Sequence, residues 1–333
     1  MALLEFTEKG IYCPQADVFI DPWRPVKRAL ITHGHADHAR SGHKHYLCTR
    51  PAWPVMRYRL GPIKAEAVAY GEPVMIDGVR FSFHPAGHIV GSAQIRIEYK
   101  GEIWVVSGDY KLENDQLSTP FEPVKCHTFI TESTFGLPVY NWQQQYFIYK
   151  AINDWWRQNK ADGKTSVITG YALGKAQRIL QGLNPSLGTI YTHGAIENIN
   201  EVIRQQGINL QPTVRITPGI KRSVFPGNIV IATPGTVGTA WMCRFNNPCV
   251  ASASGWVSNS DTRSRKAVDH GFVLSDHADW KALNQAVKET GAERVFVTHG
   301  YKKAFSRWLK KQGLDVDIIQ TEFEGELSER GKG

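Results

Sequence analysis

Short stretches in which apolar and polar residues alternate, or in which a few apolar residues stand together, dominate the first third of the chain. Both patterns predict β-strands, because successive side chains of a strand point to opposite faces of a sheet. Gly, Pro and Asp residues separate the stretches and predict turns between them. The predicted strands cover residues 17–20, 29–31, 79–83, 94–99 and 103–106.

The pattern changes near residue 140, where apolar residues three or four positions apart predict a long helix over residues 142–158. Strand-like and helix-like stretches then alternate, which is typical of βαβ units around a parallel sheet. No linker-like stretch separates consecutive domains, so we expect a middle segment inserted into one outer domain. Strands are predicted at 166–169, 189–191, 228–232, 294–298 and 315–319, and helices at 173–183, 196–206, 280–290 and 302–312.

The composition excludes several classes of protein. Hydrophobic residues make up 42% of the 333 residues, which excludes a mainly disordered chain. The chain has no apolar run of about 18 residues, no CxxC pair among its scattered cysteines and no signal-peptide pattern at its start. We therefore expect a soluble protein of a reducing cytoplasm, with no membrane partner. The net charge of +8 favours an acidic partner such as nucleic acid.

The most informative motif directly follows the apolar stretch 29–31. His33, His35, Asp37 and His38 place potential metal donors within six residues. His33 and His35 are two positions apart, so extended backbone points both side chains to the same side. We expect Asp37 and His38 to stand where the chain turns into a helix and to face a second ion. Imidazole and carboxylate donors suit zinc and manganese.

Three further candidate donors each lie just past the end of a predicted strand. They are His88, Asp109 and His299. The carboxyl ends of strands are the usual place for sites in α/β proteins, and a carboxylate such as Asp109 can bridge two metal ions. A lone His is more often structural than a ligand, but the shared position of these residues predicts one site with two divalent ions.

This order of motifs resembles the metallo-β-lactamase fold, an αββα sandwich of the α/β class. Asp21 matches the first motif of that family, an Asp that supports the histidine loop without binding metal. Glu132, His277 and His299 resemble the additional motifs of the β-CASP nucleases, the branch that contains Artemis, RNase J and the cleavage subunit of the mRNA 3′-end processing complex. The resemblance implies an outer domain of residues 1–138 and 263–325 and an inserted β-CASP α/β domain of residues 139–262.

Other motifs, among them GDYK at 108–111, ESTFGLP at 132–138 and SASGW at 252–256, resemble the bacterial ligase-associated DNA exonucleases. This likeness covers nearly the whole chain. By the family's pattern, two divalent metal ions are expected, zinc first and manganese as the other candidate. The resemblance implies that one ion is held by His33, His35, His88 and Asp109, and the other by Asp37, His38, Asp109 and His299.

The resemblance also implies catalytic roles for Asp37, Glu132 and His277, with Glu132 orienting the imidazole that protonates the leaving oxygen. Two features are candidates for binding a phosphate group. Lys175 begins a predicted helix, where the helix dipole and the ammonium group can meet a phosphate, although a solvated helix lysine is as good an interpretation. A small-residue loop, alternatively an ordinary tight turn, contains Ser252, Ser254 and Gly255.

We therefore predict a metal-dependent exonuclease that hydrolyses DNA in repair, in association with a DNA ligase and a helicase. The alternative is a ribonuclease, because RNA-acting members of the branch have a His at the position of His299, where DNA-acting members usually have an apolar residue. A small-molecule hydrolase of the same outer fold is disfavoured by the Glu132 and His277 motifs. An inactive nucleic-acid scaffold is disfavoured by the complete set of donors.

Overall fold

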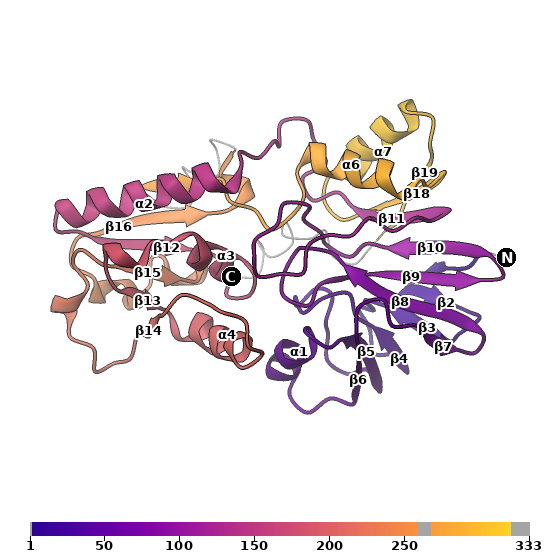
Figure 1. Ribbon diagram of the computed structural model, residues 1–333, viewed down its shortest axis with the longest axis horizontal. Helices are drawn as coiled ribbons and strands as arrows, with labels where there is room; N and C mark the ends of the chain where they lie inside the picture. Colours follow the sequence, from indigo (N-terminus) through magenta and orange to yellow (C-terminus); the bar gives the residue numbers. More distant parts are fainter. Residues whose placement is uncertain (1, 259–267, 321–333) are drawn as a thin grey trace. The chain divides into compact units, whose positions relative to one another are not determined.

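A computed structural model describes residues 2–258 and 268–320 of the chain and divides it into two compact units (Figure 1). Unit 1 consists of Met1–Asn141 and His277–Gly333, and unit 2 of Trp142–Asp276. The sequence places the first domain boundary at 138/139, a few residues before the observed division. Its second boundary, at 262/263, and its last residue, 325, lie outside the described residues.

Unit 1 contains two β-sheets. The first has the strand order β1-β2-β3-β4-β5-β6, with β1 (Glu5–Thr7), β2 (Gly10–Cys13), β3 (Val18–Ile20), β4 (Arg28–Leu30), β5 (His45–Thr49) and β6 (Ala65–Val68). The second has the order β19-β18-β11-β10-β9-β8-β7, with β7 (Val74–Ile76), β8 (Val79–Pro85), β9 (Ala93–Tyr99), β10 (Glu102–Val106), β11 (Thr128–Glu132), β18 (Arg294–Thr298) and β19 (Asp315–Ile318).

The direction of the strands in the second sheet decides where its loops meet. Strands β10, β11, β18 and β19 are parallel neighbours, and β8 and β10 are both antiparallel to β9. The carboxyl ends of β8, β10, β11 and β18 therefore lie along one edge of the sheet. Every loop that leaves this edge can bring a side chain to a common site.

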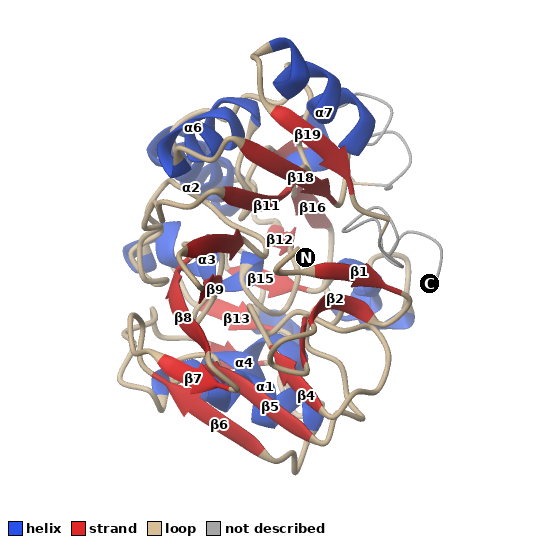
Figure 2. Ribbon diagram, turned by 90° about the vertical axis from the view of Figure 1, so that its right-hand side faces the viewer, coloured by secondary structure: helices blue, strands red, loops and turns tan. Residues whose placement is uncertain are grey.

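The two sheets of unit 1 pack face to face, with helices outside them (Figures 1 and 2). Buried apolar residues such as Ile20 of the first sheet and Phe81 of the second form one core between them. On the outer side of the second sheet, Val295 packs with Phe305, and on the first sheet Met56 belongs to a separate outer cluster. The covering helices are α1 (Trp53–Leu60), α6 (Trp280–Thr290) and α7 (Lys302–Lys311). The layers are α, β, β and α, which confirms the predicted α/β sandwich.

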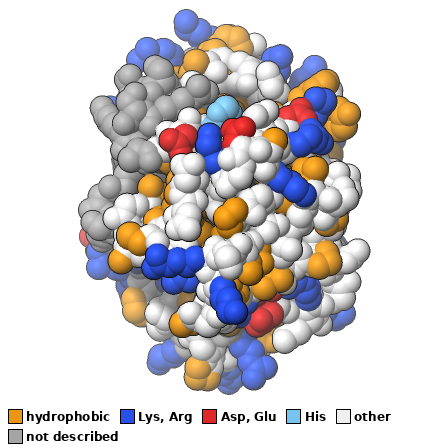
Figure 3. Space-filling view, turned by 90° about the vertical axis from the view of Figure 1, so that its left-hand side faces the viewer, with side chains coloured by type: hydrophobic (Ala, Val, Ile, Leu, Met, Phe, Trp, Pro, Cys, Tyr) orange, Lys and Arg blue, Asp and Glu red, His pale blue; other side chains and the backbone are white. Residues whose placement is uncertain are grey.

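Unit 2 is built around one parallel sheet, as its alternating pattern predicts. Its strand order is β14-β13-β15-β12-β16-β17, and its helices are α2 (Gln145–Ala161), α3 (Lys175–Gly182) and α4 (Gly194–Arg204). The strands are β12 (Thr165–Thr169), β13 (Ile190–Thr192), β14 (Val214–Arg215), β15 (Ile229–Ala232), β16 (Pro248–Ala253) and β17 (His270–Phe272). Lys and Arg side chains are spread over the face drawn in Figure 3, with few acidic ones among them.

One predicted element is wrong, because residues 32–40 form turns and not the helix expected after Asp37. The backbone hydrogen bonds there include one helix-like bond, from Ala39 N to His35 O at 2.8 Å, and one from Ala93 N to Thr32 O at 2.8 Å. The chain then passes through Gly42, with φ of 97°, into β5, so no room is left for a further helical turn.

The sequence pattern did not predict β11, which lies in the middle of the second sheet. Its sequence is TFITE, in which two apolar residues stand between polar ones, so it shows neither alternation nor a longer apolar stretch, although all five residues are buried. Within residues 2–258 and 268–320, every helix is too short or too polar to cross a lipid bilayer.

Candidate metal centre

The candidate donors of unit 1 come from loops that follow β4, β8, β10 and β18. The turn after β4 carries His33, His35, Asp37 and His38, and the turn between β8 and β9 carries His88. Asp109 follows β10, and His299 follows β18. Because these strand ends share one edge, residues that are up to 266 positions apart in the sequence meet in one place.

A first group consists of His33, His35, His88 and Asp109, whose donor atoms all lie within 4.8 Å of one another. An oxygen of Asp109 lies 3.5 Å from Nε2 of His33 and 3.9 Å from Nε2 of His88. Nε2 of His88 lies 3.1 Å from Nδ1 of His35. His33 and His88 are fully buried, so the protein holds these rings in a dry environment.

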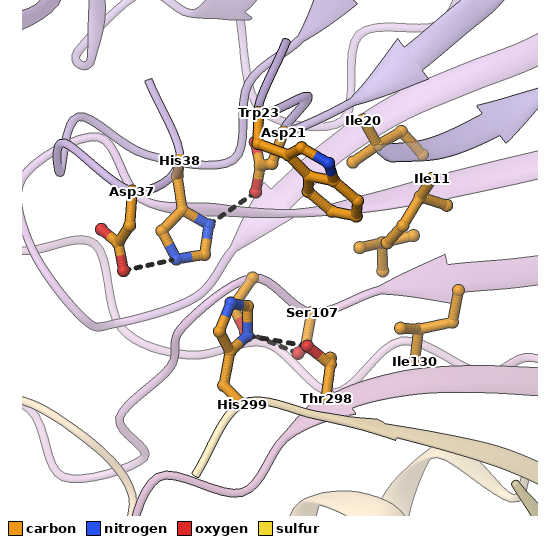
Figure 4. Close-up of a pocket in the computed structure, with 12 residues that line it drawn as sticks. Ile11, Ile20, Asp21, Trp23, Asp37, His38, Ser107, Ile130, Thr298 and His299 are labelled. Carbon is orange, nitrogen blue, oxygen red and sulfur yellow. Dashed lines mark hydrogen bonds and ion pairs between the residues drawn. The ribbon is translucent and has the colours of Figure 1, made fainter. Parts of the chain in front are cut away.

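A second group consists of Asp37, His38 and Asp109. Nε2 of His38 lies 3.6 Å from Asp37 and 3.4 Å from Asp109, so Asp109 faces both groups. His299 lines a cavity of about 30 Å³ together with Asp37 and His38 (Figure 4). Its ring centre lies 5.3 Å from that of His38, and among the described residues it belongs to neither group of donors within 4.8 Å.

Asp21 holds the histidine loop from behind. Its carboxylate accepts hydrogen bonds from the backbone N (2.8 Å) and the hydroxyl (2.5 Å) of Thr32. The same carboxylate lies 2.8 Å from Nδ1 of His38, a contact that a dashed line marks in Figure 4. In the neutral ring, Nδ1–H donates this hydrogen bond to Asp21, so Nε2 of His38 carries its lone pair on the side of Asp37 and Asp109. Sequence analysis missed Thr32, which carries no signal of its own beside His33.

Burial and charge act against each other in this centre. Burial, with the neighbouring His38, lowers the pKa of His33 well below its usual range. Burial has the same tendency at His38, but Asp109 and Asp37 outweigh it and raise that pKa well above its usual range. Burial would raise the pKa of Asp109, yet the charge of the neighbouring His38 holds it well below the usual range. The centre therefore combines a neutral His33 with an ionised Asp109, the forms that bind metal.

A third group joins the metal donors to an acid–base pair. Donor atoms of Asp109, Glu132 and His277 lie within 4.8 Å of one another. Nδ1 of His277 lies 3.1 Å from Oε2 of Glu132, and the other oxygen of Glu132 accepts a hydrogen bond from Tyr110 N at 2.8 Å. Burial raises the pKa of Glu132, against the opposing effect of His277. Asp279, two residues after His277, caps α6 by accepting a hydrogen bond from Ala282 N at 2.8 Å.

The donors fit divalent metal ions. No hydrogen bond satisfies Nε2 of His33 or of His38 within the described residues, although both atoms are buried. Leaving a buried polar atom without a partner is costly, and a metal ion would satisfy both nitrogens. The mixture of imidazole and carboxylate donors suits zinc and manganese.

The candidate phosphate-binding residues all belong to unit 2. Lys175 is buried and forms an ion pair with Asp276, so it is not a solvated helix lysine. Ser252 lies within β16, and Ser254 and Gly255 directly follow this strand. All three are buried, and Ser254 Oγ accepts a hydrogen bond from Trp256 N at 3.3 Å. The candidate metal donors belong to unit 1, whereas these candidate phosphate-binding residues belong to unit 2. Residues 263–266, a basic stretch of the sequence that could follow a nucleic-acid backbone, lie outside the described residues.

Two curated relatives match long parts of the chain. A protein of Opitutus terrae named "Probable DNA ligase" is 30% identical over 325 residues, which is 96% of this chain and 31% of the relative. The "Cleavage and polyadenylation specificity factor subunit 3-I" of Arabidopsis thaliana is 25% identical over 302 residues, which is 74% of this chain and 43% of that relative. The chain thus spans less than half the length of either relative.

A solved structure supports the fold. The crystal structure of a protein of unknown function from Enterococcus faecalis V583 has a TM-score of 0.61 and 10% sequence identity, and it covers 90% of this chain and 80% of that chain. At this identity the likeness concerns the fold alone. No family model matches the chain.

Proposed function

Since the chain belongs to the metallo-β-lactamase β-CASP nuclease family, we propose that it is a metal-dependent nuclease that hydrolyses phosphodiester bonds of DNA. One observation carries the proposal. Asp109 is common to the group with His33 and His88, to the group with Asp37 and His38, and to the group with Glu132 and His277. A proton-transfer pair therefore lies directly beside the donors for divalent ions.

The proposed ions are two, zinc by preference and manganese as the other candidate. His33, His35, His88 and Asp109 would hold one ion, and Asp37, His38, Asp109 and His299 the other. Bound divalent ions lower the pKa of water and stabilise charge on a phosphate.

The residues of the chain supply the proton chemistry. Glu132 accepts a hydrogen bond from Nδ1 of His277, which turns Nε2 of this ring toward the reacting group as the proton donor. The proton then passes from Nε2 to the leaving oxygen of the phosphodiester. Asp37 is partly exposed at the mouth of the cavity, so its carboxylate is accessible to a water or a substrate.

DNA is the proposed substrate, and repair with a DNA ligase and a helicase the proposed setting, in the cytoplasm. The support is the relative named as a probable DNA ligase, which matches 96% of this chain. Ribonuclease activity is the second candidate. It is favoured by His299 and by the relative named as a cleavage and polyadenylation specificity factor subunit.

The test compares end-labelled single-stranded DNA, duplex DNA and RNA of one sequence, digested by the purified chain. Activity should disappear with EDTA and return with zinc or manganese, and an Asp109→Ala variant should be inactive, which excludes a contaminating nuclease. Faster digestion of DNA supports the first candidate, and digestion of RNA alone supports the second. If neither nucleic acid is cleaved with either metal, the proposed function is wrong.

A further inference from the structure

Ser133 lies directly beside the loop that carries His299. Strands β11 and β18 are parallel neighbours, and Glu132 is paired with Thr298 at their carboxyl ends. The next residue on each strand is therefore Ser133 on one side and His299 on the other. Ser133 is fully buried and takes no part in the proposed proton transfer.

The hydroxyl and the carbonyl of Ser133 both hold this loop. Oγ of Ser133 donates to the carbonyl oxygen of His299 and lies 3.3 Å from that of Thr298. The carbonyl oxygen of Ser133 accepts a hydrogen bond from Tyr301 N at 2.9 Å. One buried serine thus contacts the backbone on both sides of the candidate ligand.

The backbone that Ser133 holds is strained. His299 has φ of 51°, in the left-handed region that a residue with a Cβ atom rarely adopts, and Gly300 follows with φ of 68°. A Cβ atom at Gly300 would lie 2.3 Å from the carbonyl oxygen of Ser133 and 2.4 Å from Cα of Thr134. The loop passes this close only because Gly300 has no side chain. Strained conformations persist where surrounding contacts hold them, and the contacts here come from Ser133.

A neighbouring side chain restricts the ring of His299. Thr298 Oγ1 lies 2.8 Å from Nδ1 of His299, which leaves Nε2 for the side of His38. Among the described residues, His299 belongs to neither group of donor atoms within 4.8 Å. The conformation of its loop therefore sets how near its ring lies to Asp37, His38 and Asp109.

We propose that Ser133 is a positioning residue that fixes His299 for the second metal ion. This inference rests on the proposed two-metal site. Adjacent residues then position two different histidines, because Glu132 orients His277 and Ser133 orients His299. Loss of the Ser133 hydroxyl frees the loop from its strained conformation and moves the ring away from the second ion.

The test measures zinc binding by competition with a chromophoric chelator in the full chain, with Ser133→Ala and Ser133→Cys variants. The second zinc should bind about 10–100-fold more weakly in Ser133→Ala, the range found when a residue that supports a ligand is lost, while the first zinc is unchanged. Ser133→Cys, with a weak donor, should fall between the wild type and Ser133→Ala. In the metal-free protein, hydrogen exchange at the amides of Gly300 and Tyr301 should become faster.

Ser166→Ala is the matched control, because Ser166 is, like Ser133, a fully buried serine with a hydrogen-bonded hydroxyl, but it lies in β12 of unit 2. Its hydroxyl accepts a hydrogen bond from Asn159 at 3.0 Å. Ser166→Ala should lose stability without losing zinc. If the wild type binds two zinc ions and Ser133→Ala binds the second as tightly as Ser166→Ala does, the role of Ser133 is wrong and the proposed function stands. If the wild type does not bind two divalent ions, both proposals fail together.

Discussion

Nδ1 of His277 lies 3.1 Å from Oε2 of Glu132, although 144 residues separate the two in the sequence, and both side chains are buried. Such a pair keeps the imidazole in one orientation. His277→Ala should therefore lower kcat by about 10²–10⁴-fold, the usual contribution of a general acid, without loss of bound zinc.

The measurement is single-turnover cleavage together with the zinc content of the variant. His45→Ala is the control, because His45 is an exposed histidine of the same unit. Full activity in His277→Ala would remove His277 from the proton transfer, and loss of zinc would make it a ligand.

Asp21 should act on the metal ions through His38. Asp21→Asn keeps the size of the side chain but removes the charge that accepts from Nδ1 of His38 and from Thr32. We expect divalent metal binding to weaken by about 10–100-fold. Chelator competition measures the affinity, with Asp77→Asn as the control, because Asp77 is an exposed acid paired with Arg28 in the same unit. Equal affinities of the two variants would contradict the role of Asp21.

His43 should make the stability of unit 1 depend on pH. Burial lowers the pKa of His43 from 6.5 to about 4, and its Nδ1 accepts a hydrogen bond from Val26 N. The unfolded chain therefore binds a proton between pH 6.5 and 4 that the folded chain resists. The contribution of His43 to the free energy of unfolding should be fully present above pH 6.5. The free energy of unfolding should then fall as the pH drops through this window, by up to about 3 kcal/mol.

Urea unfolding of the metal-free protein at pH 7 and pH 4 measures this effect. His43→Asn cannot titrate and retains an acceptor for Val26 N, so it should lose about 3 kcal/mol less than the wild type over the same pH change. The same pH dependence in both proteins would show that His43 is not the titrating group.

Substitution of Lys175 distinguishes a structural role of this residue from a role in phosphate binding. Lys175 and Asp276 are each 1% exposed and form an ion pair. Lys175→Met leaves a buried carboxylate without its charge partner, which costs about 3–5 kcal/mol of unfolding free energy. Urea unfolding should show this loss, whereas Lys150→Met, at an exposed ion pair, should change little. A raised KM for DNA at unchanged stability would instead support the phosphate-binding role expected from the sequence.

Much of the candidate site could be predicted because its donors have an unusual spacing. His33, His35, Asp37 and His38 stand together in the sequence, and His88, Asp109 and His299 each follow an apolar stretch. Apolar alternation also predicted most strands, since it reports which face of a strand is buried. The pattern could not predict β11, because its two adjacent apolar residues stand between polar ones and form neither an alternation nor a longer apolar stretch.

The supporting residues could not be predicted from their positions. Thr32 and Ser133 are ordinary residues beside conspicuous ones, and their hydrogen bonds to Asp21 and to the His299 loop exist only after folding. Lys175 was expected near phosphate from its place at a helix start, but its burial depends on Asp276, which is 101 positions away.

The sequence by itself indicated the fold class and the candidate donors, because donor types, their order and the apolar periods of the strands are properties of local residues. Only the tertiary structure shows that the donor atoms of each group lie within 4.8 Å of one another, and that Ser133 contacts the loop of His299. These contacts depend on parallel strands β10, β11 and β18 ending at one edge of a sheet. Strand pairing over hundreds of residues is set by the packing of the whole core, and no local pattern records it.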